Sequence, residues 1–472
     1  MEREKLGSRL GFILLSAGCA IGLGNVWKFP WLVGQNGGAF FVLIYLVFLV
    51  LMGVPIMTME FAVGRAAQRS PARMYHAVTP EKKGWRIHGY ASLVGVIMLM
   101  MFYTMVAGWM IYYFVETVNG CFIGLNPAEV GGKFGSFTGD WLSMTFYMIV
   151  VTVLCFGILS IGVQKGLERV TKYMMLALLG IMIFLAFYTI SLDGGIEGLK
   201  FYLVPNVESF MQNPMNVIVS AMNQSFFTLS IGIGSMAIFG SYINKDRALM
   251  GEAVNVAVLD TFVAITAGLI IFPACFALNN GNVDAGPPLI FITLSNVFAQ
   301  MGPVVGRIVG GFFFLFLSFA ALSTVLAVFE AILACFTEML GWSRKKACVI
   351  CCIGMIILAM PCILGFNVLS YINTIGEGKN IMDLEDFIVS NCLLPLGSLV
   401  FVLYCTWSKR GWGWKNFTQE ANTGKGLKVP RWMYGYCKFV LPVVILFLFV
   451  YGVISTLGFD DEVASLFKGL IK

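Results

Sequence analysis

The chain has 472 residues, of which 58% are hydrophobic and 12% are charged, and its mean hydropathy is +0.85. This composition excludes a soluble domain folded around one core and predicts an all-α polytopic membrane protein. The formal net charge of +6 reflects the distribution of cations between loops, so we expect no nucleic-acid partner.

Eleven apolar segments are each long enough to cross a bilayer as a helix. We expect the whole chain, residues 1–472, to form one domain surrounded by membrane lipid. The predicted transmembrane helices cover residues 10–33, 39–64, 88–116, 141–161, 172–191, 215–240, 252–278, 304–337, 346–365, 387–407 and 436–458.

The distribution of Lys and Arg residues predicts how the chain is oriented in the membrane. If the N-terminus is cytoplasmic, most of the 31 Lys and Arg residues fall in regions that face the cytosol. The loops on the other side hold only scattered cations, such as Lys133, Lys200 and Lys379. Cytoplasmic loops of membrane proteins carry this excess of positive charge. The odd number of helices then places the C-terminus outside the cell, and we expect a multi-pass protein of the plasma membrane.

The first apolar segment is interrupted at residues 17–30, AGCAIGLGNVWKFP. Three glycines, an asparagine, a lysine and a proline stand where a membrane helix should be continuous. A helix exposed to lipid cannot lose backbone hydrogen bonds at mid-depth without a cost of several kcal/mol per group. Broken helix is tolerated only where it is packed in protein or lines a cavity. The stretch therefore predicts a polar site near the membrane centre, built partly from backbone.

A second interruption, NQSFFTLSIGIGS at residues 223–235, lies in the sixth segment. Residues 1–191 hold five segments and residues 215–407 hold five more. Because five is odd, the second set starts from the opposite face of the membrane. Broken helices in matching positions of two such halves indicate a five-plus-five inverted repeat. The segment 436–458 then adds an eleventh helix.

A short apolar run, Leu289–Leu294, lies in the long loop 279–303. It is too short to span the bilayer. We expect a re-entrant or surface helix on the outer face that could act as a lid.

The ends of broken helices suit a ligand that carries both charges. Free N–H groups at a half-helix N-terminus favour an anion, and free carbonyls at a C-terminus favour a cation; an amino acid has both. Asn25 and Thr228 supply side-chain oxygens beside the two breaks, and hard cations prefer oxygen ligands. Ser323 and Thr324 in the eighth segment add two hydroxyls, although such groups often only bond back to the preceding turn.

Charged side chains within the apolar segments are a further signal. Asp260 lies in an apolar run of the seventh segment. A carboxylate at this depth indicates a functional site, with a structural ion pair or hydrogen-bonded pair as the alternative. Glu60 either caps backbone at a break or has a structural role without ligand contact. We expect the twelve cysteines to be apolar filler, and we expect His76 and His88 to be solvated loop residues.

Four motifs resemble the neurotransmitter:sodium symporter family. They are GCAIGLGNVWKFP at 18–30, NGGAFF at 36–41, KGLER at 165–169 and QSFFTLS at 224–230. The resemblance covers nearly the whole chain and is strongest to the bacterial amino-acid transporters, which include members with eleven helices. It implies the bacterial leucine-transporter fold and sodium-driven uptake, and it implies that the chain is not an enzyme.

The resemblance also implies two sodium sites. The first would consist of Ala20, Asn25, Thr228, Asp260 and the substrate carboxylate. The second would consist of Gly18, Ile21, Ala320, Ser323 and Thr324.

By the same resemblance, the substrate carboxylate would contact the backbone of Leu23 and Gly24 and the hydroxyl of Tyr103. The amine would contact carbonyls near Ala20, Phe227 and Thr228, and Ser230. The side-chain pocket would consist of Cys19, Leu99, Phe227, Ile233, Thr324 and Val328.

The resemblance further implies two gates. Lys28 would face Asp386 on the outer side, with Phe227 as a lid over the substrate. Arg3 would pair with Glu338 on the cytosolic side, near Ser241 and Tyr242.

Two departures from the family pattern, and one difference from its amine transporters, refine these expectations. Lys28 replaces the usual gate arginine and lacks its bidentate fork, so we expect a looser outer gate. Asp260 replaces the common asparagine and can substitute for chloride, so we expect chloride-independent transport. Gly22 stands where transporters of amine neurotransmitters have an aspartate, so the substrate should bring its own carboxylate.

The pocket residues favour a neutral, apolar α-amino acid. Two alternatives share the fold: a proton-coupled amino-acid permease that uses Asp260 as proton carrier, and an amino-acid sensor that does not transport. The sequence leaves the oligomeric state open.

Overall fold

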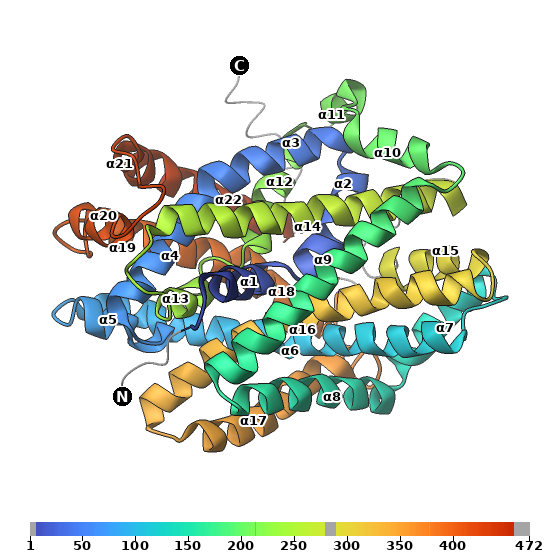
Figure 1. Cartoon of the computed structure of the whole chain (residues 1–472), viewed down its shortest axis with the longest axis horizontal. Helices are drawn as coiled ribbons and strands as arrows, with labels where there is room; N and C mark the ends of the chain where they lie inside the picture. Colours follow the sequence, from blue (N-terminus) through green and yellow to red (C-terminus); the bar gives the residue numbers. More distant parts are fainter. Residues whose placement is uncertain (1–5, 213, 279–288, 377, 457–472) are drawn as a thin grey trace.

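The computed structural model describes residues 6–212, 214–278, 289–376 and 378–456. Over these residues the fold is all-α, as predicted, and it has no strand (Figure 1). Long apolar runs form helices because every backbone polar group inside a bilayer must find its partner within the segment. Nine described helices are long and apolar enough to cross a membrane: Ala39–Ala67 (α3, η2, α4), Lys83–Asn119 (η3, α6), Trp141–Ser160 (α8), Val163–Ile190 (η4, α9), Leu249–Leu278 (α14), Val305–Leu340 (α16), Arg344–Leu364 (α17), Ile381–Thr406 (α18, η6, α19) and Met433–Ile454 (α21, η7, α22).

The two remaining predicted segments are interrupted helices. Helix α1 (Arg9–Ala20) is followed by Gly24–Gln35, which contains η1 and α2, and the two parts are bent by 56°. Helix α12 (Pro214–Thr228) is separated from α13 (Ser235–Gly240) by an unwound stretch. Both breaks therefore occur in the segments where glycine-rich sequence predicted them. The total of eleven helices and the inverted repeat stay predictions.

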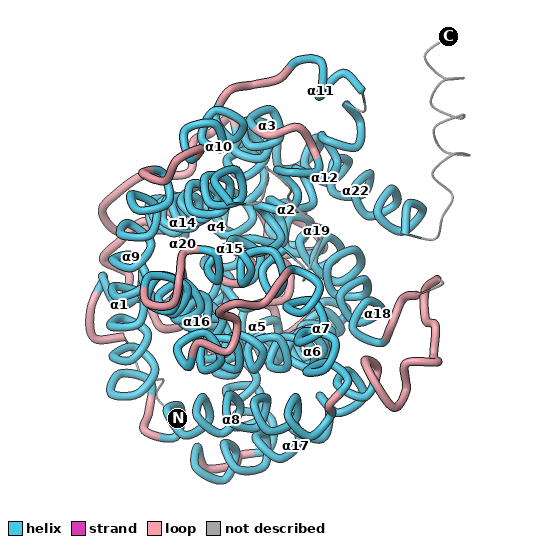
Figure 2. The backbone as a smooth tube through the Cα atoms, turned by 90° about the vertical axis from the view of Figure 1, so that its right-hand side faces the viewer, coloured by secondary structure: helices cyan, strands magenta, loops and turns pink. Residues whose placement is uncertain are grey.

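The first break lies inside the helical bundle. Helix α6 packs along α16, and α1 contacts α9, α14 and α16. Figure 2 shows the long helices nearly end-on, with α8 and α17 at one edge and α3 and α10 at the opposite edge. The break in α1 is thus shielded from lipid by protein, which is the condition that allows irregular backbone at membrane depth.

Short helices cover the two ends of the bundle (Figure 1). Helices α5 (Pro71–Val78) and α20 (Trp414–Ala421) lie at one end, which we call the α5 end. The charge distribution predicts that this end faces the cytosol. The opposite end, the α7 end, carries α7 (Pro127–Gly139), α10 (Gly195–Leu203), α11 (Val207–Gln212) and α15 (Ser295–Gln300).

The apolar run after the seventh segment is buried. It forms the π-helical turn η5 (Leu289–Leu294), which leads into α15. The Phe291 ring is fully buried and lies 5.5 Å from that of Trp109 and 5.7 Å from that of Phe134. The surface alternative is therefore wrong, because these side chains pack into the aromatic core. Residues 279–288 of the same loop lie outside the described residues.

Candidate functional site

Side chains replace the backbone hydrogen bonds that α1 loses at its break. Ile21 adopts an extended conformation, with ψ of 99°, and ends the helix. The Gly22 N–H then donates to Oδ1 of Asn25 at 3.1 Å, and the Leu23 N–H donates to the Tyr103 hydroxyl at 3.0 Å. Polar residues near this break thus satisfy amides that a continuous helix would have satisfied itself.

The second break is held by residues from other helices. Glu60 accepts a hydrogen bond from the Gly232 N–H, and the His88 ring lies 3.3 Å from the Gly232 carbonyl oxygen. The expectation that Glu60 caps backbone at a break is confirmed. The expectation for His88 is wrong: it lies in α6 (Arg86–Asn119), and its Nδ1 is 2.7 Å from the Tyr75 hydroxyl. His76 lies in α5 and is half-buried.

The residues of the first predicted sodium site come together in the structure. Asn25 Nδ2 donates to Oδ1 of Asp260 at 2.8 Å, and the Thr228 hydroxyl donates to Oδ2 of the same carboxylate at 3.0 Å. Asn25, Thr228 and Asp260 are fully buried, and Ala20 is nearly so. Tyr45 approaches the carboxylate at 3.5 Å. The donor set is oxygen-rich and includes one carboxylate, which fits a hard cation.

The residues of the second predicted site also converge, from α1 and α16 (Val305–Leu340). The Thr324 hydroxyl lies 3.1 Å from the carbonyl oxygens of both Gly18 and Ile21. It also lies 3.3 Å from the Ala320 carbonyl oxygen, which accepts a 2.9 Å hydrogen bond from Ser323. The Thr324 hydroxyl does bond back within its helix, but its contacts to α1 bring five neutral oxygens together. Such a group suits a monovalent cation.

A small cavity lies between the two breaks. Its lining contains most of the residues predicted to bind substrate, together with two residues of the tenth helix that the sequence did not indicate, Val389 and Leu394. The full lining is Ala20, Gly22, Gly24, Leu99, Tyr103, Phe227, Ser230, Ile233, Thr324, Val389 and Leu394.

Four predicted substrate residues do not line this cavity. Val328 is fully buried in the core. Cys19 is also buried, and its carbonyl oxygen accepts a 3.4 Å hydrogen bond from Ser230. Thr228 contacts the Asp260 carboxylate, and Leu23 contacts Tyr103 through its backbone.

Gly22 is required at its position for steric reasons. A Cβ atom there would lie 2.1 Å from the Tyr103 hydroxyl and 2.6 Å from the Thr324 hydroxyl. No side chain fits without moving both groups. This position therefore has no room for the carboxylate-bearing side chain that amine transporters place there.

A larger cavity of about 410 Å³ lies on the other side of Phe227 and Tyr103, which line both cavities. Lys28 Nζ lies 3.7 Å from Oδ2 of Asp386 at its wall and 4.0 Å from the centroid of the Phe227 ring. Ser390 donates a 2.7 Å hydrogen bond to the same aspartate. The predicted outer pair is present, and its lysine also lies over the predicted lid.

The predicted cytosolic gate is only partly described. Arg3 lies outside the described residues. Oε2 of Glu338 accepts hydrogen bonds from the backbone N–H of Ser70 at 2.8 Å and from its hydroxyl at 2.7 Å. Tyr242 donates to Oε1 of Glu330 at 2.6 Å, and Arg344 pairs with Oε2 of the same carboxylate at 2.6 Å.

Two further contacts close the α5 end around the start of α1. Glu168 accepts hydrogen bonds from the Gly7 N–H at 2.8 Å and the Ser8 hydroxyl at 2.9 Å. Arg9 Nη2 lies 2.9 Å from Oε1 of Glu252. Neither contact was predicted from the sequence, although Glu168 lies in the KGLER motif at 165–169.

A family model described as the sodium:neurotransmitter symporter family matches residues 3–122 and 137–462. The chain belongs to this family. The resemblance inferred from the sequence motifs is thereby confirmed. Membership makes the chain a multi-pass membrane protein of a sodium-dependent transporter family, not an enzyme.

Relatives extend over most of the chain. The uncharacterized sodium-dependent transporter YhdH of Bacillus subtilis is 33% identical over 451 residues, which are 95% of this chain and 98% of that protein. The sodium-dependent neutral amino acid transporter SLC6A17 of Rattus norvegicus is 27% identical over 57% of this chain and 40% of its own length. The crystal structure of MhsT in complex with L-phenylalanine matches with a TM-score of 0.85 and 37% identity, covering 95% of this chain and 100% of that one.

The tenth-helix residues of this symporter could not have been found from sequence. Val389 and Leu394 are apolar residues in an apolar segment, so neither composition nor periodicity marks them. Gln224 did lie in a motif, and the structure shows its contact: Nε2 donates to the Gly24 carbonyl oxygen at 2.8 Å. This bond joins the two broken helices directly.

Proposed function

We propose that this symporter couples sodium ions to the uptake of neutral, hydrophobic α-amino acids by alternating access. The observation that carries the proposal is the small cavity between the breaks, which is lined by residues of both breaks, by hydroxyl groups and by apolar side chains. The names of its relatives support it, because they include neutral amino acid transporters and a protein solved with L-phenylalanine.

The cavity suggests how an amino acid would bind. The backbone of Leu23 and Gly24 and the Tyr103 hydroxyl would hold the carboxylate, and Ser230 with nearby carbonyls would hold the amine. Gly22 leaves no space for a protein carboxylate, so the substrate supplies that charge. Because Leu99, Ile233, Val389 and Leu394 form the apolar wall, a charged side chain would lose its hydration without gaining a partner.

Two sodium ions are the proposed stoichiometry. The Asn25, Thr228 and Asp260 group would bind one ion next to the substrate carboxylate, and the Thr324 group would bind the other between α1 and α16. One sodium ion moving inward gains about 2.3 kcal/mol per 100 mV of membrane potential. A tenfold concentration gradient adds about 1.4 kcal/mol. Two ions would together supply roughly 7 kcal/mol. This free energy limits the accumulation of a zwitterion to about 10⁵-fold.

Chloride independence is part of the same proposal. The buried Asp260 carboxylate lies among the proposed ligands of the first ion, so a fixed negative charge is already present. Replacing chloride by gluconate should leave uptake unchanged, and loss of uptake would refute this part.

Alternating access requires that ligands bind one state more tightly than the other. Sodium bound between α1 and α16 would favour the state in which both breaks are ordered. Substrate beneath Phe227 would then favour closure of the Lys28–Asp386 pair. Release of the second ion would disconnect α1 from α16 and permit opening at the α5 end.

The decisive experiment measures binding of a panel of amino acids to the purified full-length protein, with and without sodium. We expect sodium-dependent binding of aliphatic or aromatic amino acids, and no competition by monoamines. Asn25→Ala should abolish sodium-dependent binding, whereas the matched surface variant Asn416→Ala should not. Unchanged sodium affinity in Asn25→Ala would overturn the site assignment.

Two transport assays separate the alternatives. Counterflow in proteoliposomes would be absent for a sensor that binds without transporting. Uptake driven by a pH gradient without sodium would instead identify the proton-coupled permease with Asp260 as carrier.

A further inference from the structure

A positively charged cavity lies at the α5 end, away from the transport site. It has a volume of about 390 Å³ and lies where the tenth and eleventh helices come together. Figure 1 shows α19 (Leu394–Thr406), α20 and α21 (Met433–Gly435) gathered at this end of the molecule. The cavity is lined by Thr406, Trp407, Ser408, Lys409, Arg410 and Lys438.

The lining holds three cations and no carboxylate. Lys409 and Arg410 are exposed, and within the described part of the chain neither they nor Lys438 form an ion pair with an acidic side chain. Lys438 donates a 3.0 Å hydrogen bond to the Tyr434 hydroxyl, which fixes its position without neutralising it. By contrast, Arg9, Arg65 and Arg344 at the same end each pair with a glutamate.

The turn that carries Lys409 and Arg410 is fixed by its backbone. Trp85 donates to the Arg410 carbonyl oxygen at 2.7 Å, and Lys82 donates to the Gly411 carbonyl oxygen at 2.5 Å. The Trp412 N–H donates to the Tyr404 carbonyl oxygen at 2.8 Å. These bonds fix the backbone of the turn, and the exposed side chains of Lys409 and Arg410 remain available to a ligand.

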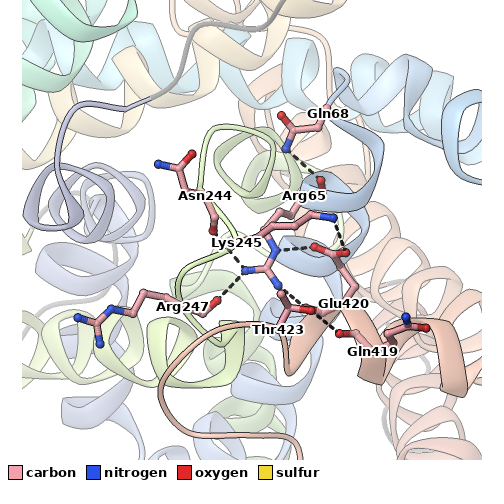
Figure 3. Close-up of polar contacts among 8 residues, drawn as sticks. All are labelled: Arg65, Gln68, Asn244, Lys245, Arg247, Gln419, Glu420 and Thr423. Atoms are coloured by element: carbon pink, nitrogen blue, oxygen red, sulfur yellow. Dashed lines mark hydrogen bonds and ion pairs between the residues drawn. The ribbon is translucent and has the colours of Figure 1, made fainter.

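Helix α20, which follows this turn, is anchored as well (Figure 3). The fully buried Arg65 donates to Oε1 of Glu420 at 2.6 Å and to the Arg247 carbonyl oxygen at 2.7 Å. Lys245 reaches the same glutamate at 3.3 Å. These contacts hold α20, and the backbone bonds of the preceding turn hold Lys409 and Arg410 at the wall of the cavity, which Lys438 also lines.

Aromatic side chains place this cavity at the membrane surface. Trp407, Trp432 and Phe439 are 39%, 66% and 64% exposed. Trp residues are enriched at the level of lipid headgroups. Cations between helix ends at this level bind the phosphate groups of anionic lipids, and a lysine–arginine set supplies the N–H donors that phosphate oxygens accept.

We propose that this cavity binds the phosphate of an anionic phospholipid in the leaflet at the α5 end. One phosphodiester would be held jointly by Lys409, Arg410 and Lys438, with the acyl chains beside the apolar faces of α19 and α22 (Leu441–Thr456). The lipid would thereby bridge the tenth helix, which lines the substrate cavity, and the eleventh.

Native mass spectrometry of the purified full-length protein tests the proposal. Phosphatidylglycerol and phosphatidylcholine are titrated separately, and their apparent affinities are compared. The variant Lys409→Gln/Arg410→Gln/Lys438→Gln should lose the preference for phosphatidylglycerol by about tenfold or more. The control Lys415→Gln/Lys425→Gln/Lys428→Gln removes three exposed cations of the same region that do not line the cavity, and it should retain the preference.

Retention of the preference in the variant without the cavity cations overturns the proposal, and so do the following two results. An equal loss in both variants would mean that general surface charge attracts the lipid. Displacement of phosphatidylglycerol by inorganic phosphate at similar concentration would indicate a soluble-anion site. If the triple variant fails to fold, Lys438→Gln alone should weaken phosphatidylglycerol binding about fivefold, and an unchanged affinity in that variant would refute the assignment. Sodium-dependent amino-acid binding serves as the check of folding throughout.

Discussion

The two sides of the substrate cavity are closed by very different contacts. On the side predicted to face outward, the ion pair Lys28–Asp386 spans 3.7 Å between side chains that are 27% and 39% exposed. At the α5 end Arg344 contacts both oxygens of Glu330, at 3.1 Å and 2.6 Å, and that carboxylate is 1% exposed. Tyr242 adds a third donor.

This difference shows which side the described conformation seals more firmly. Exposed pairs contribute between zero and about 1 kcal/mol because water and salt screen them. Removing one partner of a buried pair costs several kcal/mol, because the other charge is left without compensation. The closure at the α5 end is therefore sensitive to the loss of one charge, whereas the outer closure is not.

The largest effect is expected from neutralising the buried carboxylate at the α5 end. Glu330→Gln leaves Arg344 without its counter-charge and weakens the acceptor of Tyr242. We expect the seal to lose about 2 kcal/mol, which is roughly a 30-fold shift toward opening at this end. Hydrogen exchange of the α13 amides and substrate affinity measured from the outer side would report the shift.

The matched outer variant, Asp386→Asn, should change the same two measurements by less than about threefold. Equal effects of the two carboxylate-to-amide changes would mean that the two closures do not differ in strength.

A smaller effect is expected from Glu168→Gln. This carboxylate accepts two hydrogen bonds from Gly7 and Ser8, and loss of its charge should weaken them by about 1 kcal/mol in total. Exchange of amides near the start of α1 should then rise about fivefold. The exposed Glu197→Gln on α10 is the control, and unchanged exchange in Glu168→Gln would show that Glu168 does not hold the N-terminal segment.

The outer pair can also be strengthened. Lys28→Arg introduces a planar guanidinium that can contact Asp386 through two N–H groups and stack on Phe227. We expect dissociation of a bound amino acid to slow about twofold, a gain of about 0.5 kcal/mol. Faster dissociation would show that the loose contact is not what limits closure.

The smallest effect is that of salt. Raising ionic strength with choline chloride at constant sodium should weaken the exposed outer pair while leaving the buried pair intact. Amino-acid dissociation should accelerate by less than about twofold. Asp386→Asn should abolish this response, and a response that persists in that variant would place the salt effect elsewhere.

The sequence predicted the features that depend on residues unusual for an apolar segment. Glycine, asparagine and proline inside an apolar run mark a break wherever they occur, and a buried carboxylate such as Asp260 is unusual enough to be noticed. The structure brings together the residues of each oxygen group that the family resemblance implied.

Contacts that depend on the long-range course of the chain could not be predicted. Arg9 and Glu252 are separated by 243 residues, and each looks like an ordinary charge at a segment end. Arg65 was one of many predicted cytosolic cations, yet it is fully buried. The resemblance implied an inner gate of Arg3 and Glu338, near Ser241 and Tyr242. The described residues add further charged contacts, Arg344–Glu330 and Arg9–Glu252.

The unwound backbone of the second break is held at one glycine from three directions. Glu60 of α4 (Val54–Ala67) contacts the Gly232 N–H, His88 of α6 contacts its carbonyl, and a Cβ atom at Gly397 of α19 would come within 1.9 Å of that oxygen. Irregular chain of this kind would ordinarily sample many conformations and lose that entropy when a ligand binds. Here the loss occurs during folding, so a substrate meets a stretch of non-helical peptide that is already as ordered as the helices around it.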